Sequence, residues 1–151
     1  MDIREAVPSD AEAVSAMLYA LVAVGKRTRP SDVEFVREVY ISSPLGICTS
    51  VAVEGDDMLG IQILNHAYEG NPYGAPLGSG TIGTHAAPWA ARRGVGRALF
   101  QATLAAARVA KLKTIEAFIH KDNAEGHGYY AAMGFEPLRE DGDALVRAFT
   151  L

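Results

Sequence analysis

The sequence predicts a single domain of the α/β class, built on a mixed sheet. A chain of 151 residues suits one hydrophobic core, and 49% hydrophobic against 21% charged residues excludes a disordered chain. In the second half, strand-like runs lead into helices and return to strands, whereas the middle of the chain reads as a hairpin. Such a mixture is typical of helices packed against a mixed sheet.

The first expected elements are a short strand and a helix. Residues 3–7 predict the strand, which Pro8 closes. Ser9 or Asp10 can cap the helix that follows, since short polar side chains accept hydrogen bonds from the free N–H groups of a first turn. Apolar residues recur on one face of this helix, and Gly25 ends it.

A second helix and a β-hairpin come next. Ser31 or Asp32 caps this helix, which stops before Pro44. Residues 47–54 and 58–68 then predict two strands. The Gly-Asp-Asp sequence between them is typical of a tight hairpin turn.

The second half of the chain alternates between strands and helices. A loop rich in Gly and Pro, over residues 69–80, joins it to the hairpin. The helix expected over 95–110 has an apolar surface so wide that it implies burial against a sheet. The remaining elements are strands at 80–85, 114–120, 135–138 and 144–151 and a helix at 124–133, with the last strand at the edge of the sheet.

Charge and composition argue against several classes of function. The formal net charge of -4, from 14 basic and 18 acidic residues, disfavours a nucleic-acid-binding protein. The lone Cys48 excludes an internal disulfide and a multi-cysteine zinc site, and we expect no metal. Charges from the second residue onward leave no apolar core for a signal peptide, and no window is long enough for a membrane span. We therefore expect a cytoplasmic protein that acts on small molecules.

The clearest binding motif is the segment ARRGVGR, residues 91–97, at the start of the long helix. Its two glycines let the backbone turn tightly and direct several N–H groups outward at the positive end of the helix dipole, which favours an anion. Three arginines, Arg92, Arg93 and Arg97, add positive charge suited to phosphate. The alternative is a tight loop with solvated arginines.

Two other phosphate-binding motifs do not fit this segment. A dinucleotide fingerprint needs Gly or Ala where Leu99 stands, directly after a strand, but a loop follows His85. A P-loop ends in Gly-Lys-Ser/Thr, which the segment lacks. An unrelated nucleotide-binding α/β domain is therefore disfavoured.

A second informative segment, NAEGHGYYAAMGF, covers residues 123–135. Gly134 and Phe135 end the short helix, and Tyr130 lies on its last turn. Asn123 stands at the junction of strand and helix, where its amide can cap the helix or donate to a ligand carbonyl.

Together the two segments resemble the GCN5-related N-acetyltransferase (GNAT) superfamily. The family pattern [Gln/Arg]-x-x-Gly-x-[Gly/Ala] corresponds to residues 91–96, and Pro88 stands six residues before its first glycine. The later pattern, Asn, then Tyr seven residues on, then Gly-Phe after three more, corresponds to Asn123, Tyr130 and residues 134–135.

The resemblance is clearest over residues 80–136, and it implies a fold and an activity for the whole chain. The fold is one GNAT domain over residues 1–151, with a mixed, mostly antiparallel sheet of six to seven strands flanked by about four helices. The activity is transfer of an acetyl group from acetyl-CoA, or of another short acyl group from its CoA thioester, to a primary amine of a small molecule such as an amino acid. The amine attacks the thioester directly.

The resemblance also implies roles for individual residues. Tyr130 corresponds to the general acid that protonates the departing thiolate, and the backbone around residues 84–86 polarises the thioester carbonyl. Ala91 departs from the family, which prefers Gln or Arg there, and this puts the affinity for the cofactor in doubt. The implied cofactor-binding residues are Thr84, His85, Ala86, Arg92, Arg93, Gly94, Val95, Gly96, Arg97, Asn123 and Tyr130.

The general base and the acceptor site are less defined. His85 is the candidate base, because it ends the strand expected beside the acetyl group and an ordinary histidine pKa suits proton transfer near neutral pH. The alternatives are a structural His85 and proton transfer through water to a distant carboxylate. The candidate acceptor-binding residues, in the basic loop 25–30 and the loop 69–80, are Arg27, Arg29, Tyr68 and Tyr73.

The arginines can recognise a carboxylate on the acceptor, or they can belong to a solvated basic loop. A second function, an acyl-CoA-binding or sensing module without catalysis on the same fold, is favoured by Ala91 and by the lack of an obvious base. The intact Tyr130 favours the enzyme. Terminal strands of such domains often pair between subunits, so a homodimer is a further expectation.

Overall fold

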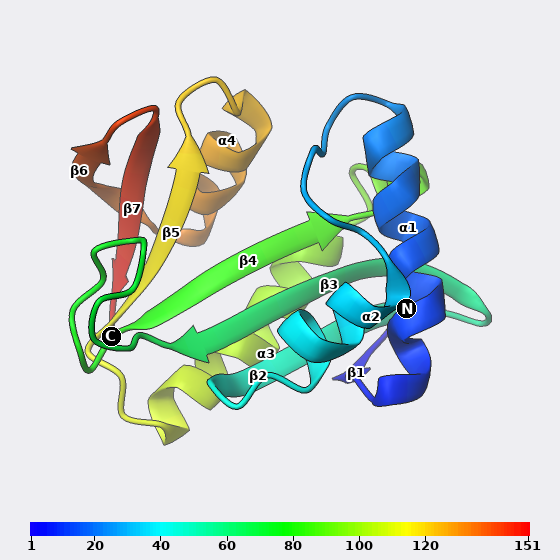
Figure 1. Ribbon diagram of the computed structural model, residues 1–151, viewed down its shortest axis with the longest axis horizontal. Helices are drawn as coiled ribbons and strands as arrows, with labels where there is room; N and C mark the ends of the chain where they lie inside the picture. The colour runs from blue at the N-terminus through cyan, green and yellow to red at the C-terminus, as the bar shows by residue number, and fades with distance from the viewer.

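Seven strands form one open sheet in the computed structural model, which describes residues 1–151 (Figure 1). Their order is β1-β2-β3-β4-β5-β7-β6, and every neighbouring pair is antiparallel except β4 and β5. The strands are β1 Asp2–Glu5, β2 Gly46–Glu54, β3 Asp57–His66, β4 Gly80–Ala86, β5 Thr114–His120, β6 Glu136–Asp141 and β7 Ala144–Thr150. The predicted mixed, mostly antiparallel sheet is confirmed.

Helices cover both faces of this sheet. They are α1 Ala11–Ala23, α2 Val33–Phe35, α3 Val95–Val109 and α4 Ala124–Met133, with short 3-10 turns η1 Pro8–Asp10 and η3 Pro88–Ala90. In Figure 1, α1 and α2 lie on the face turned to the viewer, and α3 and α4 lie behind the sheet. The second predicted helix is present in altered form, because α2 is a single short stretch that continues into a π-helical turn, η2, over Val36–Ile41.

β4 and β5 separate soon after they meet. Their parallel pairing covers only Gly80 with Ile115 and Thr81 with Glu116. β4 then continues along β3, and β5 continues along β7, so the two strands diverge (Figure 1). A strand pair normally satisfies main-chain N–H and C=O groups, and beyond these two positions the facing edges of β4 and β5 do not satisfy each other. The sheet is therefore open at its centre.

Two hydrophobic clusters hold the two halves of the sheet. The first packs α1, η2 and the first turns of α3 against β2 and β3. The second packs the rest of α3 and part of α4 against β4 and β5. In the second cluster the rings of Phe100, Phe135 and Phe149 meet with centroids 5.4 to 5.5 Å apart. Because α3 contributes to both clusters, it ties the two halves together behind the opening.

The position of the last strand differs from the sequence-based prediction. β7 lies between β5 and β6, so the prediction that the closing strand forms the edge is wrong. β7 pairs with β5 from Thr150 to Ala144, and Ala144 and Val146 on it are buried. β6 is exposed along most of its length and takes the edge. Burial of β7 decides the order, and its chain position carries no such information.

The two predicted helix caps also have different outcomes. Asp32 caps α2, since its carboxylate accepts a hydrogen bond from the N–H of Phe35 at 3.1 Å. Asp10 makes no cap hydrogen bond to α1. Its carboxylate instead accepts two hydrogen bonds from the guanidinium of Arg4, each 2.8 Å long, and one from the N–H of Val7. The hydrogen bonds from Arg4 are the main reason that the pKa of Asp10 is lowered.

We expect Asp10→Asn to lower the free energy of unfolding at neutral pH by about 1 kcal/mol, because the ion pair with Arg4 is lost. The folded pKa of Asp10 lies below its unfolded value, so its contribution is complete above the unfolded pKa and is lost as the pH falls through the folded pKa. The difference between the two proteins, measured by urea unfolding, should therefore shrink in acid. Asp56→Asn, at an exposed hairpin turn, is the control and should show no such difference. A difference independent of pH would contradict the prediction.

Candidate functional site

The turn before α3 presents free main-chain donors. Arg92 and Gly94 adopt left-handed conformations, with φ of 62° and 74°. No main-chain or side-chain acceptor takes the N–H groups of residues 94–97, and no side chain caps the helix. Successive N–H groups in such a turn, at the positive end of a helix, form a site for an anion. We call residues 94–97 the anion seat, because their free N–H groups are the donors that the predicted anion-binding site requires.

The three arginines of this turn have different surroundings. Arg93 is ion-paired with Glu54 at the end of β2. Arg92 and Arg97 are exposed and make no ion pair. Two of the three predicted phosphate-binding arginines are thus available to a ligand, and the third is partly neutralised.

Gly96, inside the first turn of α3, is required for packing, whereas the left-handed turn before the helix uses Gly94. A Cβ atom on Gly96 would lie 2.5 Å from Cε1 of Tyr129 on α4. The hydroxyl of Tyr129 donates a hydrogen bond to the carbonyl of Gly96 at 2.7 Å. The sequence analysis assigned Gly96 to cofactor binding and did not single out Tyr129. The structure connects the two, so that α4 braces the first turn of α3.

Tyr130 lies in the protein interior, beside β4. Its side chain is 7% exposed, and its hydroxyl is 2.8 Å from Oγ1 of Thr84. Burial raises the pKa of the Tyr130 phenol, and the hydrogen bond with Thr84 opposes that shift. The phenol therefore keeps its proton at neutral pH, as a proton donor must before it acts.

A buried glutamine that the sequence analysis did not single out connects these groups. Gln62, on β3, is fully buried, and its Nε2 donates to Thr84 Oγ1 and to Tyr129 Oη, each at 2.9 Å. Its Oε1 accepts a hydrogen bond from Thr103 of α3. A signal was present, because Gln62 is the one polar side chain within the apolar run LGIQIL of β3.

Asn123 caps α4. Its Oδ1 accepts a hydrogen bond from the N–H of Gly126 at 2.9 Å, as one of the two sequence-based interpretations predicted. The amide nitrogen is not used by this cap and can donate to a ligand.

His85 lies on the opposite face of β4 from Thr84. Its ring stacks on that of Tyr40, with centroids 5.5 Å apart and 21° between the planes. Burial lowers the pKa of His85 to about 3, and the charges of Arg27 and Arg29 contribute. The expectation that its pKa lies near neutrality therefore does not hold, because the surroundings disfavour the imidazolium form.

The two arginines of the loop between α1 and α2 have separate roles. Arg27 is 7% exposed and donates to Pro30 O at 2.6 Å, to Ser31 Oγ at 2.9 Å and to Tyr40 Oη at 3.1 Å. No carboxylate balances this buried charge. Arg27 therefore shapes the loop and supplies positive potential, whereas the exposed Arg29 lines a cavity.

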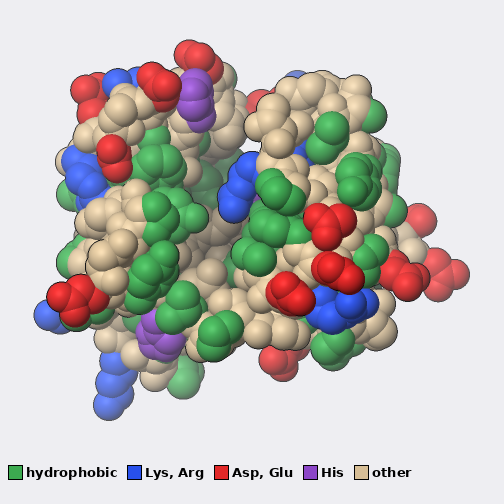
Figure 2. Space-filling view, viewed as in Figure 1, with side chains coloured by type: hydrophobic (Ala, Val, Ile, Leu, Met, Phe, Trp, Pro, Cys, Tyr) green, Lys and Arg blue, Asp and Glu red, His purple; other side chains and the backbone are tan.

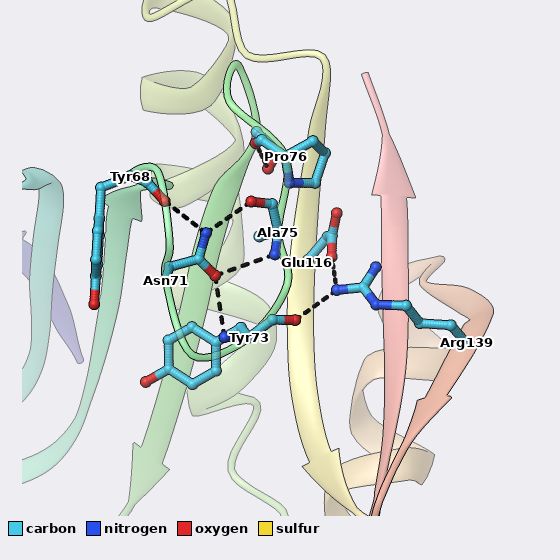
Figure 3. A network of polar contacts seen from close by, with 8 residues as sticks. Tyr68, Asn71, Tyr73, Ala75, Pro76, Glu116 and Arg139 are labelled. Atoms are coloured by element: carbon cyan, nitrogen blue, oxygen red, sulfur yellow. Dashed lines mark hydrogen bonds and ion pairs between the residues drawn. The ribbon is translucent and has the colours of Figure 1, made fainter.

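The loop between β3 and β4 is held in place by Asn71 (Figure 3). The amide nitrogen of Asn71 donates to the carbonyls of Tyr68 and Ala75, and its oxygen accepts from the N–H groups of Tyr73 and Ala75. With all four of its hydrogen bonds inside the loop, Asn71 fixes the loop's course.

An ion pair attaches this loop to the other half of the sheet. Arg139 of β6 donates to the carbonyl of Tyr73 at 2.7 Å and pairs with the buried Glu116 of β5 at 2.8 Å (Figure 3). Although Tyr73 and Arg139 are far apart in the sequence, they are joined across the open part of the sheet.

Two cavities meet at Tyr73. One, of about 250 Å³, has Tyr68, Asn65 and Thr81 in its lining. The other, of about 400 Å³, is lined by Arg29, Tyr73, Phe118, His120, Asp141, Asp143 and Ala144. Figure 2 shows the surface hollowed between the two halves of the molecule on this face. The structure thus brings Tyr68, Tyr73 and Arg29 to one face, with Arg27 and His85 beside them.

No group of three or more His, Cys, Asp or Glu side chains is placed to hold a metal ion. None of the helices has the length and apolar character to cross a membrane.

Comparisons with known proteins identify the family. The sequence profile of the Acetyltransferase (GNAT) family matches residues 23–135. The chain belongs to this family. Its membership confirms the predicted family, fold and enzyme class, an acyl-CoA-dependent acetyltransferase. No curated protein matches the sequence.

Solved structures of other acetyltransferases share the fold of this GNAT protein. A GCN5-related N-acetyltransferase from Kribbella flavida has a TM-score of 0.78 and 22% identity over 99% of this chain and 97% of its own. The yncA protein from Salmonella typhimurium, solved with its cofactor acetyl-CoA, has a TM-score of 0.73 and 17% identity over 99% of this chain and 93% of its own. The PaiA N-acetyltransferase from Thermoplasma acidophilum, in complex with coenzyme A, has a TM-score of 0.74 and 16% identity over 99% of this chain and 98% of its own.

We expect the His85 imidazole of this GNAT protein to stay neutral down to about pH 5, because burial and two arginines disfavour the charged ring. NMR titration of the His85 ring protons, assigned with His85→Asn, checks this. Arg29→Gln should raise the pKa, whereas Arg108→Gln on α3 should leave it unchanged. Protonation of His85 near pH 6.5 would contradict the assignment.

Proposed function

We propose that this protein transfers the acetyl group of acetyl-CoA, or another short acyl group, to the primary amine of a small molecule that also carries a carboxylate, such as an amino acid. The observation that carries the proposal is the set of unpartnered N–H groups over residues 94–97, located at the start of α3. A cytoplasmic location and a homodimer stay predictions from the sequence.

The start of α3 fits the pyrophosphate of the donor. The four N–H groups supply hydrogen bonds, and Arg92 and Arg97 supply charge without an acidic partner. Gly94 has no side chain to obstruct the turn, and nothing lies within 4 Å of where its Cβ would be. Ala91 contributes no polar group, so the main chain and the two arginines carry the binding.

The divergence of β4 and β5 fits the remainder of the donor. Beyond Thr81 the edge of β4 that faces β5 has no strand partner, so main-chain donors around residues 84–86 are available for a carbonyl. Bound acetyl-CoA would supply an activated thioester to this edge. Tyr130 lies on the α3 side of β4 through its contact with Thr84, where its phenol proton can pass to a departing thiolate.

The acceptor side of β4 has a different character. His85, Arg27 and Arg29 make it positive and partly desolvated. The same conditions that disfavour the His85 imidazolium also disfavour an ammonium ion, so an incoming amine loses its proton to solvent more readily there. His85 then acts as a neutral hydrogen-bond acceptor for the amine, and it does not keep a proton taken from the amine.

The positive potential also supports the choice of acceptor. Arg29 is exposed at the larger cavity, and the buried charge of Arg27 is not balanced by a carboxylate. An anionic group on the acceptor would complement both charges. Tyr68 and Tyr73 contribute the aromatic wall on the β3–β4 loop.

We expect Gly94→Glu to weaken acetyl-CoA binding by at least about tenfold, because a carboxylate in the anion seat repels a pyrophosphate. Isothermal calorimetry measures the affinity directly. Gly94→Asn is the matched control, since asparagine tolerates the left-handed conformation and adds no charge. Equal affinities for Gly94→Glu and the wild type would remove the anion seat from the proposal.

Turnover is tested with thiol release from acetyl-CoA across a panel of amino acids, the same compounds as amides, diamines and peptides. We expect the free amino acids to react faster than their amides, and Arg29→Gln to reduce this preference. Tyr130→Phe should lower kcat on the order of a hundredfold while leaving acetyl-CoA affinity nearly unchanged. Tight acetyl-CoA binding without turnover of any amine would instead favour the acyl-CoA-sensing module.

A further inference from the structure

The hydrogen-bond network around Gln62 has a fixed polarity. The carbonyl of Gly96 can only accept, so the hydroxyl of Tyr129 must donate to it. The second contact of Tyr129 must then bring a donor, which is the amide nitrogen of Gln62. The hydrogen bonds therefore fix which end of the Gln62 amide is nitrogen and which is oxygen. The oxygen faces the hydroxyl of Thr103 and accepts a hydrogen bond from it.

The same accounting leaves one proton unused. Gln62 donates to Thr84 Oγ1, and Thr84 and Tyr130 share a single hydrogen bond in which either can donate. Two hydroxyl protons are therefore available for one bond. One of them, on Thr84 or on Tyr130, makes no full hydrogen bond within this network, although Thr84 also interacts with the hydroxyl of Tyr129. A ligand atom that accepts it would complete the network.

We propose that Gln62 is a positioning residue that sets the two ends of the acyl-CoA site from a single buried side chain. One of its N–H groups holds the Thr84–Tyr130 pair, whose spare proton serves the sulfur of the donor. The other holds Tyr129, which braces Gly96 in the first turn of α3, where the pyrophosphate sits. This inference rests on the proposed function.

We call the contact of Gln62 with Thr84 and the contact of Gln62 with Tyr129 the two arms of the network. Removing one arm at a time should cause different losses of ligand binding. Thr84→Val deletes the hydroxyl that orders Tyr130, and Thr84→Ser keeps it. Tyr129→Phe deletes the brace on Gly96 and leaves the Thr84–Tyr130 pair. Gln62→Met, of similar length, removes both contacts together. Thr103→Val is the matched control, since it removes the remaining hydrogen bond of Gln62 but neither arm.

Calorimetry with CoA and with desulfo-CoA, which lacks the sulfur, separates the arms without any need for turnover. We expect Thr84→Val to lower the ratio of CoA to desulfo-CoA affinity by about tenfold and to leave desulfo-CoA affinity unchanged. Tyr129→Phe should lower the affinities for CoA and for desulfo-CoA by a similar factor. Gln62→Met should show both changes, Thr103→Val neither, and Thr84→Ser should restore the ratio.

Kinetics with the best acceptor of the amine panel give a second readout. Thr84→Val should lower kcat with little change in KM for acetyl-CoA, whereas Tyr129→Phe should raise KM with little change in kcat. Thermal unfolding of each variant controls for loss of structure. If the wild type binds CoA but Gln62→Met leaves both affinities unchanged, or if Thr84→Val and Tyr129→Phe behave alike, the inference is overturned and the proposed function stands. A wild type that binds neither CoA nor desulfo-CoA overturns both.

Discussion

The early separation of β4 from β5 is the constraint on which the rest of the structure depends. Only two residue pairs join the strands, and each strand then follows a different neighbour. Main-chain groups left without a ladder partner inside a protein need other partners. The fold supplies none from a further strand, so the opening is suited to an extended ligand that makes these hydrogen bonds itself. Two separate hydrophobic clusters, bridged by α3, let the halves of the sheet diverge without loss of packing.

On the α3 side of the opening, polar groups are buried, and their cost is met by pairing. Gln62 and Thr103 are fully buried, and each finds a partner in the other. Replacing one partner alone would leave a buried polar group unsatisfied, so the network resists piecemeal change. Such a network also fixes geometry, because its donors and acceptors fit only one arrangement. This explains why Gly96, which has no side chain, stands where Tyr129 passes.

Much of the fold could be predicted from the sequence, because local signals decide it. The strand over 114–120 and the helix over 124–133 have the bounds that their patterns predict. The turn before α3 was also predictable, since glycine spacing and helix start are local. The order of β6 and β7 was not, because it depends on which strand buries its face against β5.

The candidate site likewise contains residues that the sequence could predict and residues that it could not. Motif residues such as Asn123 and Tyr130 stand out by spacing, but Gln62 acts through contacts with residues 22 to 67 positions away. The pKa of His85 likewise could not be read from its type. Histidine ordinarily titrates near neutrality, and only the folded arrangement places it in a desolvated setting beside Arg27 and Arg29. Long-range packing, which no local pattern encodes, sets both properties.

The positive charge near His85 raises an apparent conflict with the proposed function, since the proposed amine acceptor would arrive as a cation. The conflict disappears when binding and reaction are considered separately. A carboxylate on the proposed acceptor would be attracted to Arg29 and would offset the repulsion of the ammonium. Near β4, the low solvation and the two arginines that lower the pKa of His85 would then favour the neutral form of such an amine, which is the form that attacks a thioester. A net charge of -4 over the whole chain therefore coexists with positive potential at both sides of the opening, at the start of α3 and in the α1–α2 loop.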